Sequence, residues 1–250
     1  MSGLAGSRTL VTGASSGIGA AVATLLAARG ARVVGTGRSK EGLAQGDFVS
    51  RSCRDLTSPG APESVVSEAV EVLGGLDLVV SSAGSGWAGP IESMTDEDLG
   101  TVLDINLRVP LQLARAAGPH LRAGRGCLVL VGSIAGLVGV ADEVAYSAAK
   151  AGVRAMAESL REEWPEVDIV LVNPGPVATA FFDRRNRPYD RSWPRPLPVA
   201  RVAMATVDAI ERRRPEVVVP SWLALPARLN GGLPWLYRAL ARTRPGRRRS

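Results

Sequence analysis

Hydrophobic residues gather in seven short runs along the chain, rich in Val and Leu and mostly without alternating polar positions. A strand that is covered on both faces has few polar positions, so we interpret these runs as buried strands of a parallel sheet. The runs span residues 8–13, 31–37, 47–53, 76–82, 126–133, 167–173 and 215–220.

Helical patterns fall between most of these runs, and strands that alternate with helices predict a right-handed, doubly wound sheet with helices on both faces. We therefore expect one Rossmann-type α/β domain with a seven-stranded parallel sheet over residues 1–220. We interpret residues 180–198 as an irregular substrate lid rather than a linker, because a helix and a strand follow this Pro-rich segment. The predicted helices span residues 17–29, 61–73, 96–117, 144–163 and 198–213.

Composition fits helices packed closely on a sheet, since 28 of the 250 residues are Gly and only 4% are aromatic. No run of about 18 uncharged apolar residues could span a bilayer, and neither end shows a leader pattern, so we expect a cytoplasmic protein. Cys53 and Cys127 each lie in a predicted strand, without the spacing of metal ligands. We expect both to be reduced core residues and expect no metal site.

Charge is distributed unevenly, because residues 1–211 carry 20 basic and 23 acidic side chains, whereas residues 212–250 carry ten arginines and one glutamate. The tail, residues 221–250, mixes arginine with Trp222 and Trp235, a pattern of segments that lie on membranes or cap apolar pockets. Three interpretations stay open: peripheral membrane contact or an apolar substrate, docking on the protein's own body or a second subunit, and disorder. Nothing offers base readout, so specific nucleic-acid binding is not expected.

A glycine-rich turn follows the first predicted strand, in the sequence TGASSGIG at residues 12–19. Glycines at 13, 17 and 19 allow a tight turn and close approach of a ligand, while the following helix directs free amides at phosphate. We interpret this as a nucleotide site, although an ordinary strand-to-helix turn is the simpler alternative.

The end of the second predicted strand indicates which nucleotide is bound. A cofactor without a 2′-phosphate is usually held there by an acidic residue, whereas this chain offers Arg38 and Ser39. The planar guanidinium of Arg38 suits a 2′-phosphate, so we expect NADP(H) rather than NAD(H). The alternative is a solvated arginine in a surface loop.

A tyrosine and a lysine lie four positions apart in YSAAK, residues 146–150, on one face of a predicted helix. A cation beside the phenol of Tyr146 would lower its pKa, so that it exchanges a proton near neutral pH. Ser133 ends a predicted strand at the ligand-binding edge and could hold a carbonyl oxygen. The amide of Asn106 could hold a water that links Lys150 to solvent.

Over residues 7–220 the sequence resembles the short-chain dehydrogenase/reductase family of about 250 residues, by TGASSGIG, RDLT, Asn106, Ser133, YSAAK and NPGPVAT. The resemblance implies that Tyr146 donates or accepts the proton, Ser133 positions the carbonyl, Lys150 also binds the nicotinamide ribose and Asn106 sustains a water relay. It also implies a set of cofactor-binding residues: Gly13, Ser15, Ser16, Gly17, Ile18, Gly19, Arg38, Ser39, Asp55, Leu56, Ser82, Ala83, Gly84, Tyr146, Lys150, Pro174, Gly175, Val177 and Thr179.

One motif departs from the family, because its usual Asn-Asn-Ala-Gly is Ser81, Ser82, Ala83 and Gly84 here. We expect reduced stability rather than lost chemistry from this change. The tyrosine-lysine spacing and the chain length exclude enoyl reductases and extended epimerases. We expect NADP(H)-dependent reduction of a ketone or aldehyde; the alternative is a non-catalytic, cofactor-binding relative that acts as a regulator or scaffold.

Two further expectations concern the substrate, which the lid would contact, and the assembly of subunits, which the family resemblance implies. The lid's arginines, at 184, 185, 187, 191 and 195, either receive an anionic substrate group or keep a mobile loop solvated. The family commonly pairs through the helices that carry Asn106 and Tyr146, so we expect a homodimer or homotetramer. An apolar substrate pocket could be lined by Trp87, Phe181, Phe182 and Trp193.

Overall fold

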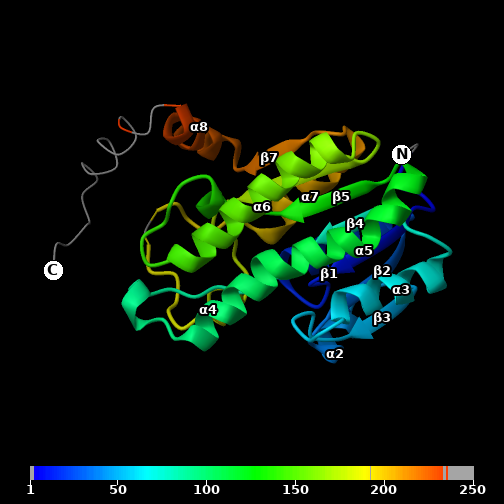
Figure 1. Ribbon diagram of the computed structural model, residues 1–250, viewed down its shortest axis with the longest axis horizontal. Coiled ribbons are helices and arrows are strands. Elements are labelled where there is room, and N and C mark those ends of the chain that lie inside the picture. The colour runs from blue at the N-terminus through cyan, green and yellow to red at the C-terminus, as the bar shows by residue number, and fades with distance from the viewer. Residues whose placement is uncertain (1–2, 192, 233–234, 236–250) are drawn as a thin grey trace.

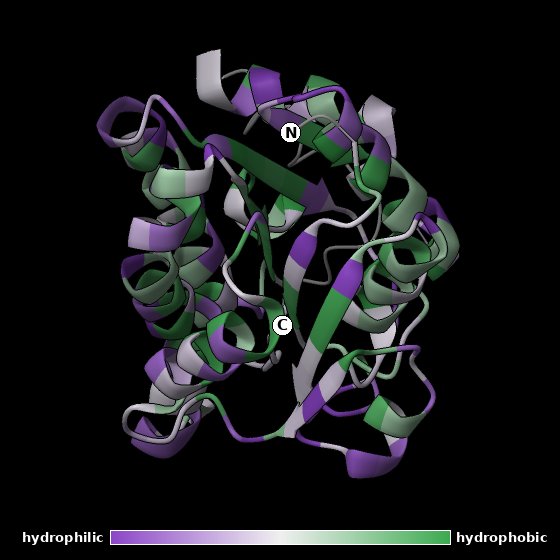
Figure 2. Ribbon diagram, turned by 90° about the vertical axis from the view of Figure 1, so that its right-hand side faces the viewer, coloured by the Kyte–Doolittle hydropathy of each residue, from purple (hydrophilic) through white to green (hydrophobic). Residues whose placement is uncertain are grey.

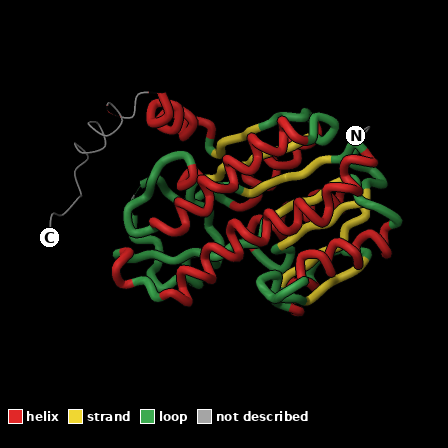
Figure 3. The backbone as a smooth tube through the Cα atoms, in the orientation of Figure 1, coloured by secondary structure: helices red, strands yellow, loops and turns green. Residues whose placement is uncertain are grey.

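The computed structural model describes residues 3–191, 193–232 and 235 (Figure 1). Its seven strands form one sheet in which every pairing is parallel, with the order β3-β2-β1-β4-β5-β6-β7 (Figure 3). The predicted seven-stranded doubly wound sheet is therefore confirmed. The strands are β1 (Arg8–Thr12), β2 (Arg32–Gly37), β3 (Ser50–Cys53), β4 (Leu78–Ser81), β5 (Cys127–Val131), β6 (Asp168–Pro174) and β7 (Glu216–Val219).

The strand order reverses beside β1, because the chain runs outward through β2 and β3 and then returns to place β4 on the other side of β1. In an open parallel sheet the connections at such a reversal diverge and leave a crevice at the carboxyl ends of the strands. The glycine-rich turn that follows β1 lies at this point.

Helices cover both faces of the sheet (Figure 2). Residues of α3, α5 and α6 join one buried hydrophobic cluster, and residues of α1 and α7 join the other. Since β4, β5 and β6 contribute side chains to both clusters, they lack polar alternation. The α-helices are α1 (Gly17–Ala28), α2 (Lys40–Ala44), α3 (Ala61–Leu73), α4 (Asp96–Leu103), α5 (Val109–Gly124), α6 (Val144–Glu163), α7 (Val199–Glu211) and α8 (Ala224–Gly232).

The helix predicted over 96–117 is interrupted. A π-helical turn, Asp104–Arg108, separates α4 from α5, and α5 extends to Gly124. Pro110 has no N–H to donate to the carbonyl of Asn106, four residues earlier, which removes one α-helical hydrogen bond at this place. The short helices α2 and α8 had no predicted counterpart.

The expectation that Cys53 is a core residue was wrong, because this side chain is exposed. It ends β3, an edge strand with alternating burial, so one of its faces meets solvent. Cys127, in the central strand β5, is buried as expected. Both thiols are free.

Part of the C-terminal tail lies within the described ranges. Helix α8 is held to the body by a hydrogen bond from Asn230 Nδ2 to the Leu137 carbonyl, 3.1 Å long, and Trp222, Leu225 and Trp235 expose much of their side chains. Residues 233–234 and 236–250 lie outside the described residues, so the tail interpretations remain predictions there. No described helix has the length and apolar character needed to cross a membrane.

Candidate functional site

A cavity of about 1220 Å³ opens at the carboxyl ends of the strands, at the predicted crevice. The glycine-rich turn, the ends of β4, β5 and β6, the start of α6 and the lid all line it. The structure therefore brings together most of the predicted site residues: Gly13, Ser16, Gly17, Ile18, Gly19, Arg38, Ser82, Ala83, Gly84, Asn106, Ser133, Tyr146, Lys150, Pro174, Gly175, Val177 and Thr179.

The glycine-rich turn is built for close backbone approach. A Cβ added at Gly19 would lie 2.4 Å from the Gly13 carbonyl oxygen, which leaves no room for a larger residue. Ser16 occupies the N-cap position of α1 without a side-chain capping bond, so free amides at the start of this helix point outward. Such an end favours the phosphates of a dinucleotide.

Thr12 ties this turn to the end of β4. Its Oγ1 accepts hydrogen bonds from the backbone amides of Ser82, at 3.0 Å, and Ala83, at 3.2 Å. Thr12 thus links β1 to the end of β4, where Ser81 and Ser82 replace the asparagines that are usual in the family. The reduced stability expected from that replacement remains a prediction.

Ser133, Tyr146 and Lys150 meet in the cavity. Ser133 follows β5, and its Oγ accepts a 3.1 Å hydrogen bond from the amide of Ala135. Tyr146 lies in the first turn of α6, and its phenol interacts with the Ser133 side chain, which acts to lower the pKa of the phenol. Lys150, one turn further along α6, is buried and donates from Nζ to the Val131 carbonyl at 2.9 Å.

The expected direction of the Tyr146 shift was wrong. Burial raises the pKa of the Tyr146 phenol well above its usual range, although the interaction with Ser133 acts in the opposite direction. The reason is that an apolar surrounding disfavours the phenolate more than its polar neighbours favour it. Burial also lowers the pKa of Lys150 to about 8, because it disfavours the ammonium in the same way.

Asn106 occupies the π-helical turn and is fully buried. Its Nδ2 donates to the carbonyls of Ser85, at 2.7 Å, and Val102, at 2.9 Å. Its Oδ1 has no hydrogen-bond partner among the described residues, and a Cβ built on Gly84 would lie 2.8 Å from this oxygen and 3.9 Å from Lys150 Nζ. The unpaired acceptor therefore faces the space beside the lysine, where a water could join them.

Arg38 is exposed at the end of β2 and lines the far end of the cavity. Ser39 is engaged elsewhere, because its hydroxyl caps α2 by accepting from the Gly42 amide at 3.0 Å and donates to Glu41 at 3.1 Å. Of the predicted pair, Arg38 alone presents its side chain to the cavity.

Four predicted cofactor residues do not line the cavity: Ser15, Ser39, Asp55 and Leu56. Leu56 is buried in the core cluster that α3 and α5 share. The Asp55 carboxylate accepts from Thr57, whose backbone hydrogen bond lowers the pKa of Asp55. Ser15 packs against Gly37, where an added Cβ would lie 2.6 Å from its Oγ. A cofactor role for these four side chains remains a prediction.

The lid forms an aromatic wall beside the phenol. The Phe181 ring centroid lies 5.6 Å from that of Tyr146, and Phe182 packs edge-on against Phe181 at 5.5 Å. Further out, Trp193 and Trp222 stack with their centroids 4.8 Å apart. All four of the aromatic residues predicted to form an apolar pocket, Trp87, Phe181, Phe182 and Trp193, line the cavity.

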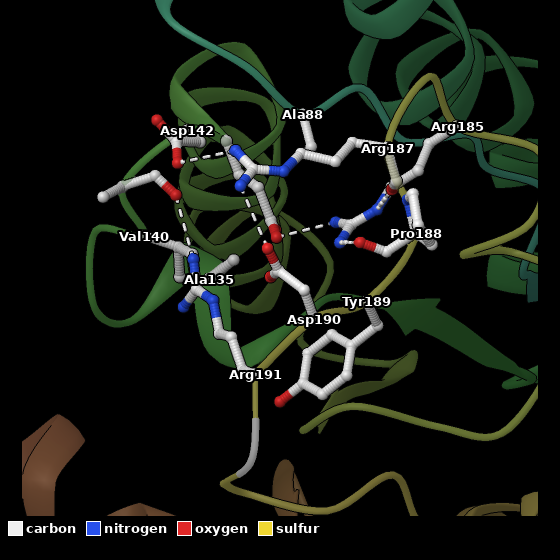
Figure 4. A network of polar contacts seen from close by, with 12 residues as sticks. Ala88, Ala135, Val140, Asp142, Arg185, Arg187, Pro188, Tyr189, Asp190 and Arg191 are labelled. Atoms are coloured by element: carbon white, nitrogen blue, oxygen red, sulfur yellow. Dashed lines mark hydrogen bonds and ion pairs between the residues drawn. The ribbon is translucent and has the colours of Figure 1, made fainter. Parts of the chain in front are cut away.

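The lid's arginines are bonded to the protein rather than only solvated (Figure 4). Arg185 is buried and pairs with Glu143 at 2.8 Å, directly before α6. Arg187 pairs with Asp142 and Asp190, and Arg191 donates to the Ala141 carbonyl at 3.0 Å. Arg185 is therefore not a solvated side chain, whereas Arg187 and Arg191 are exposed, and the solvated loop remains a prediction for them. The Arg185–Glu143 pair could not be predicted from the sequence, because its two residues lie 42 positions apart.

Comparison with known proteins agrees with this geometry. The family model described as short chain dehydrogenase matches residues 7–190. An uncharacterized oxidoreductase of Staphylococcus aureus is 34% identical over 204 residues, covering 78% of this chain and 88% of that protein. A 3-oxoacyl-(acyl-carrier-protein) reductase of Vibrio cholerae is 34% identical over 184 residues, covering 70% and 75%.

Two solved structures are similar over most or all of the chain. A short chain dehydrogenase of Burkholderia cenocepacia in complex with NADP is 29% identical, with a TM-score of 0.77, and covers 87% of this chain and 98% of its own. A short chain dehydrogenase/reductase of Burkholderia phymatum in complex with NAD covers all of both chains with a TM-score of 0.82. At 22% identity, the second supports the fold alone.

Proposed function

The chain belongs to the short-chain dehydrogenase family, and from this premise we propose that it is an NADP(H)-dependent oxidoreductase that reduces a ketone or aldehyde to an alcohol. The observation that carries the proposal is the meeting of Ser133, Tyr146 and Lys150 in one cavity with a phosphate-binding turn. The similar short chain dehydrogenase of Burkholderia cenocepacia was solved in complex with NADP, which supports a nicotinamide cofactor.

The cavity fits such a cofactor, because the close-packed turn at Gly13 and Gly19 and the start of α1 accept a diphosphate. Arg38 supports NADP(H), since a guanidinium binds the 2′-phosphate in a bidentate manner. When bound, the reduced cofactor supplies a hydride to the carbonyl carbon. The chain's own residues would position the carbonyl oxygen, donate the proton and replace it.

Tyr146 is the proton donor in this proposal. Its raised pKa keeps the phenol protonated at neutral pH, as a general acid for reduction must be. The Ser133 hydroxyl, which lines the same cavity as the phenol, holds the substrate oxygen within reach of the same proton. As negative charge develops on that oxygen, both hydroxyls donate to it.

Lys150 and Asn106 supply the replacement proton. With a pKa of about 8, Lys150 exchanges protons near neutral pH without a large cost. The unpaired Oδ1 of Asn106 faces the lysine and would hold a water between it and solvent. The relay thus runs from this water through Lys150 to the phenol.

The substrate is proposed to be apolar near its carbonyl group. Phe181 packs against Tyr146, and Trp87 lines the same cavity, so the reacting carbon would lie against aromatic rings. A non-catalytic regulator or scaffold is the alternative function. It is disfavoured because all four catalytic positions are filled and face the cavity.

Assembly and location are further proposals. A homodimer or homotetramer through α5 and α6 is supported by the exposed Leu111 and Val144 on these helices. Peripheral membrane contact through residues 221–250 is supported by the exposed Trp222, Leu225 and Trp235. Location in the cytoplasm remains a prediction from the sequence.

The test is oxidation of NADPH with a panel of ketones and aldehydes, comparing the protein with Tyr146→Phe. We expect turnover of at least one apolar carbonyl compound and a loss of about 10²-fold or more in the variant, with NADPH affinity unchanged. Equal rates in both proteins would exclude Tyr146 as the donor. Binding of NADPH without turnover of any compound would favour the regulator.

A further inference from the structure

Two consecutive arginines of the lid bind opposite walls of the cavity. Arg185 Nη1 donates to Glu143 at 2.8 Å, on the side of the catalytic helix α6. Arg184 Nη1 donates to the hydroxyl of Ser16 at 3.2 Å, on the side of the glycine-rich turn. The lid therefore bridges the proton-donating and the phosphate-binding parts of the cavity.

Arg184 meets the turn where a phosphate would bind. Ser16 is the N-cap of α1, and the side chain of Thr179 lies close to Gly17 at the same helix end. A serine hydroxyl is a neutral partner that leaves the guanidinium charge uncompensated. Within the described part of the chain, Arg184 has no carboxylate partner. A full positive charge and a helix N-terminus thus converge on one place, an arrangement suited to an anion.

The rest of the lid holds Arg184 in this position. Arg185 is nine-tenths buried, donates from Nε to the Arg187 carbonyl at 2.6 Å and stacks over Phe182, with 4.8 Å between its Cζ and the ring centroid. The amide of Arg184 donates to the Ala180 carbonyl at 3.1 Å. Because these contacts hold the lid backbone at Arg184, binding a ligand there costs less conformational entropy than it would in a loop without them.

We propose that Arg184 is a ligand of the cofactor's bridging diphosphate, and that the Arg185–Glu143 pair positions it. This inference rests on the proposed nicotinamide cofactor. On binding, the guanidinium exchanges the Ser16 hydroxyl for a phosphate oxygen, so that the bound cofactor draws the lid onto its own diphosphate. Arg184 then binds the diphosphate, which NADPH and NADH share. Arg38 binds the 2′-phosphate, which only NADPH carries.

The test measures dissociation constants by titration calorimetry for NADPH, NADH and adenosine 2′-monophosphate. Arg184→Met should weaken NADPH and NADH equally, by about tenfold, and leave adenosine 2′-monophosphate unchanged, because this probe has no diphosphate. Arg38→Met should weaken NADPH and the monophosphate but not NADH. Arg195→Met, another exposed lid arginine, serves as the matched control and should change none of the three.

Undiminished binding of both dinucleotides by Arg184→Met would overturn the inference while the proposed function stands. If the unchanged protein binds neither dinucleotide, the proposed function itself fails. Arg184→Gln, an uncharged variant of different shape, repeats the test should the methionine variant not fold. Arg184→Lys should lose less affinity than either, since it keeps the charge but not the planar fork.

Discussion

The ammonium of Lys150 lies 5.7 Å from the ring centroid of Tyr146 and donates to the Val131 carbonyl at the end of β5. The lysine is thus anchored to the sheet beside the phenol rather than paired with a carboxylate. Burial destabilises the ammonium of Lys150 more than its hydrogen bond to the Val131 carbonyl stabilises it, so the pKa of Lys150 is lowered. The consequences reach both stability and catalysis.

Stability should rise with pH because of Lys150. Its pKa is about 8 in the folded protein and near 10.5 in the unfolded chain, so between these values the unfolded state binds more protons. The free energy of unfolding should therefore increase by about 2 kcal/mol from pH 7.5 to 9.5 through this group. The free energy of unfolding would be measured in urea at each pH for the protein and for Lys150→Met. The difference between the two cancels the contribution of the buried Cys127 thiol, which has the opposite pH dependence. A difference that does not change with pH would contradict the buried ammonium.

Removing the Ser133 hydroxyl should impair turnover more than binding. Ser133→Ala deletes one of two donors to the substrate oxygen, for which we expect kcat to fall about 10²-fold. The amide of Ala135 also loses its acceptor, which should lower the free energy of unfolding by about 1 kcal/mol. Steady-state kinetics beside NADPH titration separates the two effects. Ser133→Thr, which keeps the hydroxyl, should retain most activity.

Cofactor preference should depend on Arg38. Arg38→Asp replaces the phosphate-binding fork with a carboxylate, so the affinity for NADPH should fall by at least tenfold while NADH loses far less. Competitive titration of the two nucleotides measures the ratio. Lys40→Met, a change at the neighbouring exposed cation, is the control. If the lysine variant alone lost the preference, Arg38 would be the wrong residue.

The buried pair in the lid should dominate local stability. The side chains of Arg185 and Glu143 are 4% and 13% exposed, so Arg185→Met would strand a buried carboxylate and cost about 3–5 kcal/mol. Adding Glu143→Gln should restore much of the loss, because no charge is then left unpaired. Arg187→Met, which breaks half-exposed pairs, should cost about 1 kcal/mol or less. Thermal unfolding of the unchanged protein, of the single variants Arg185→Met and Glu143→Gln and of the double variant forms the cycle, and additive losses would contradict the pairing.

The sequence predicted the sheet and the meeting of Tyr146 and Lys150 in one cavity because both depend on local patterns. Val- and Leu-rich runs place the strands, and the spacing from Tyr146 to Lys150 places both side chains on one face of α6. The direction of the shift in the Tyr146 pKa could not be predicted in this way, since it depends on how far the fold buries the phenol. The Arg185–Glu143 pair was missed for the same reason, because only the fold brings these residues together.

Leu56 illustrates a second limit. The family resemblance placed it among the cofactor-binding residues, whereas the structure places its side chain in the core with residues of α3 and α5. Sequence resemblance identifies a segment but does not say which of its side chains faces the ligand. The break in the helix predicted over 96–117 was readable in principle, since Pro110 removes a hydrogen bond at that place.

The π-helical turn at Asp104–Arg108 determines how the protein would respond to the deletion of a residue between α4 and α5. Such a turn holds about one residue more than an α-helical turn, which makes it equivalent to an insertion within a continuous helix. Deleting one residue there would join α4 to α5 as a regular helix and leave their relative orientation nearly unchanged, because the wide turn already accommodates the extra residue. Leu113 and Leu121 could keep their places in the core while the amide of Asn106 turned away from Lys150, so a shortened chain could fold and still lose the proposed water relay.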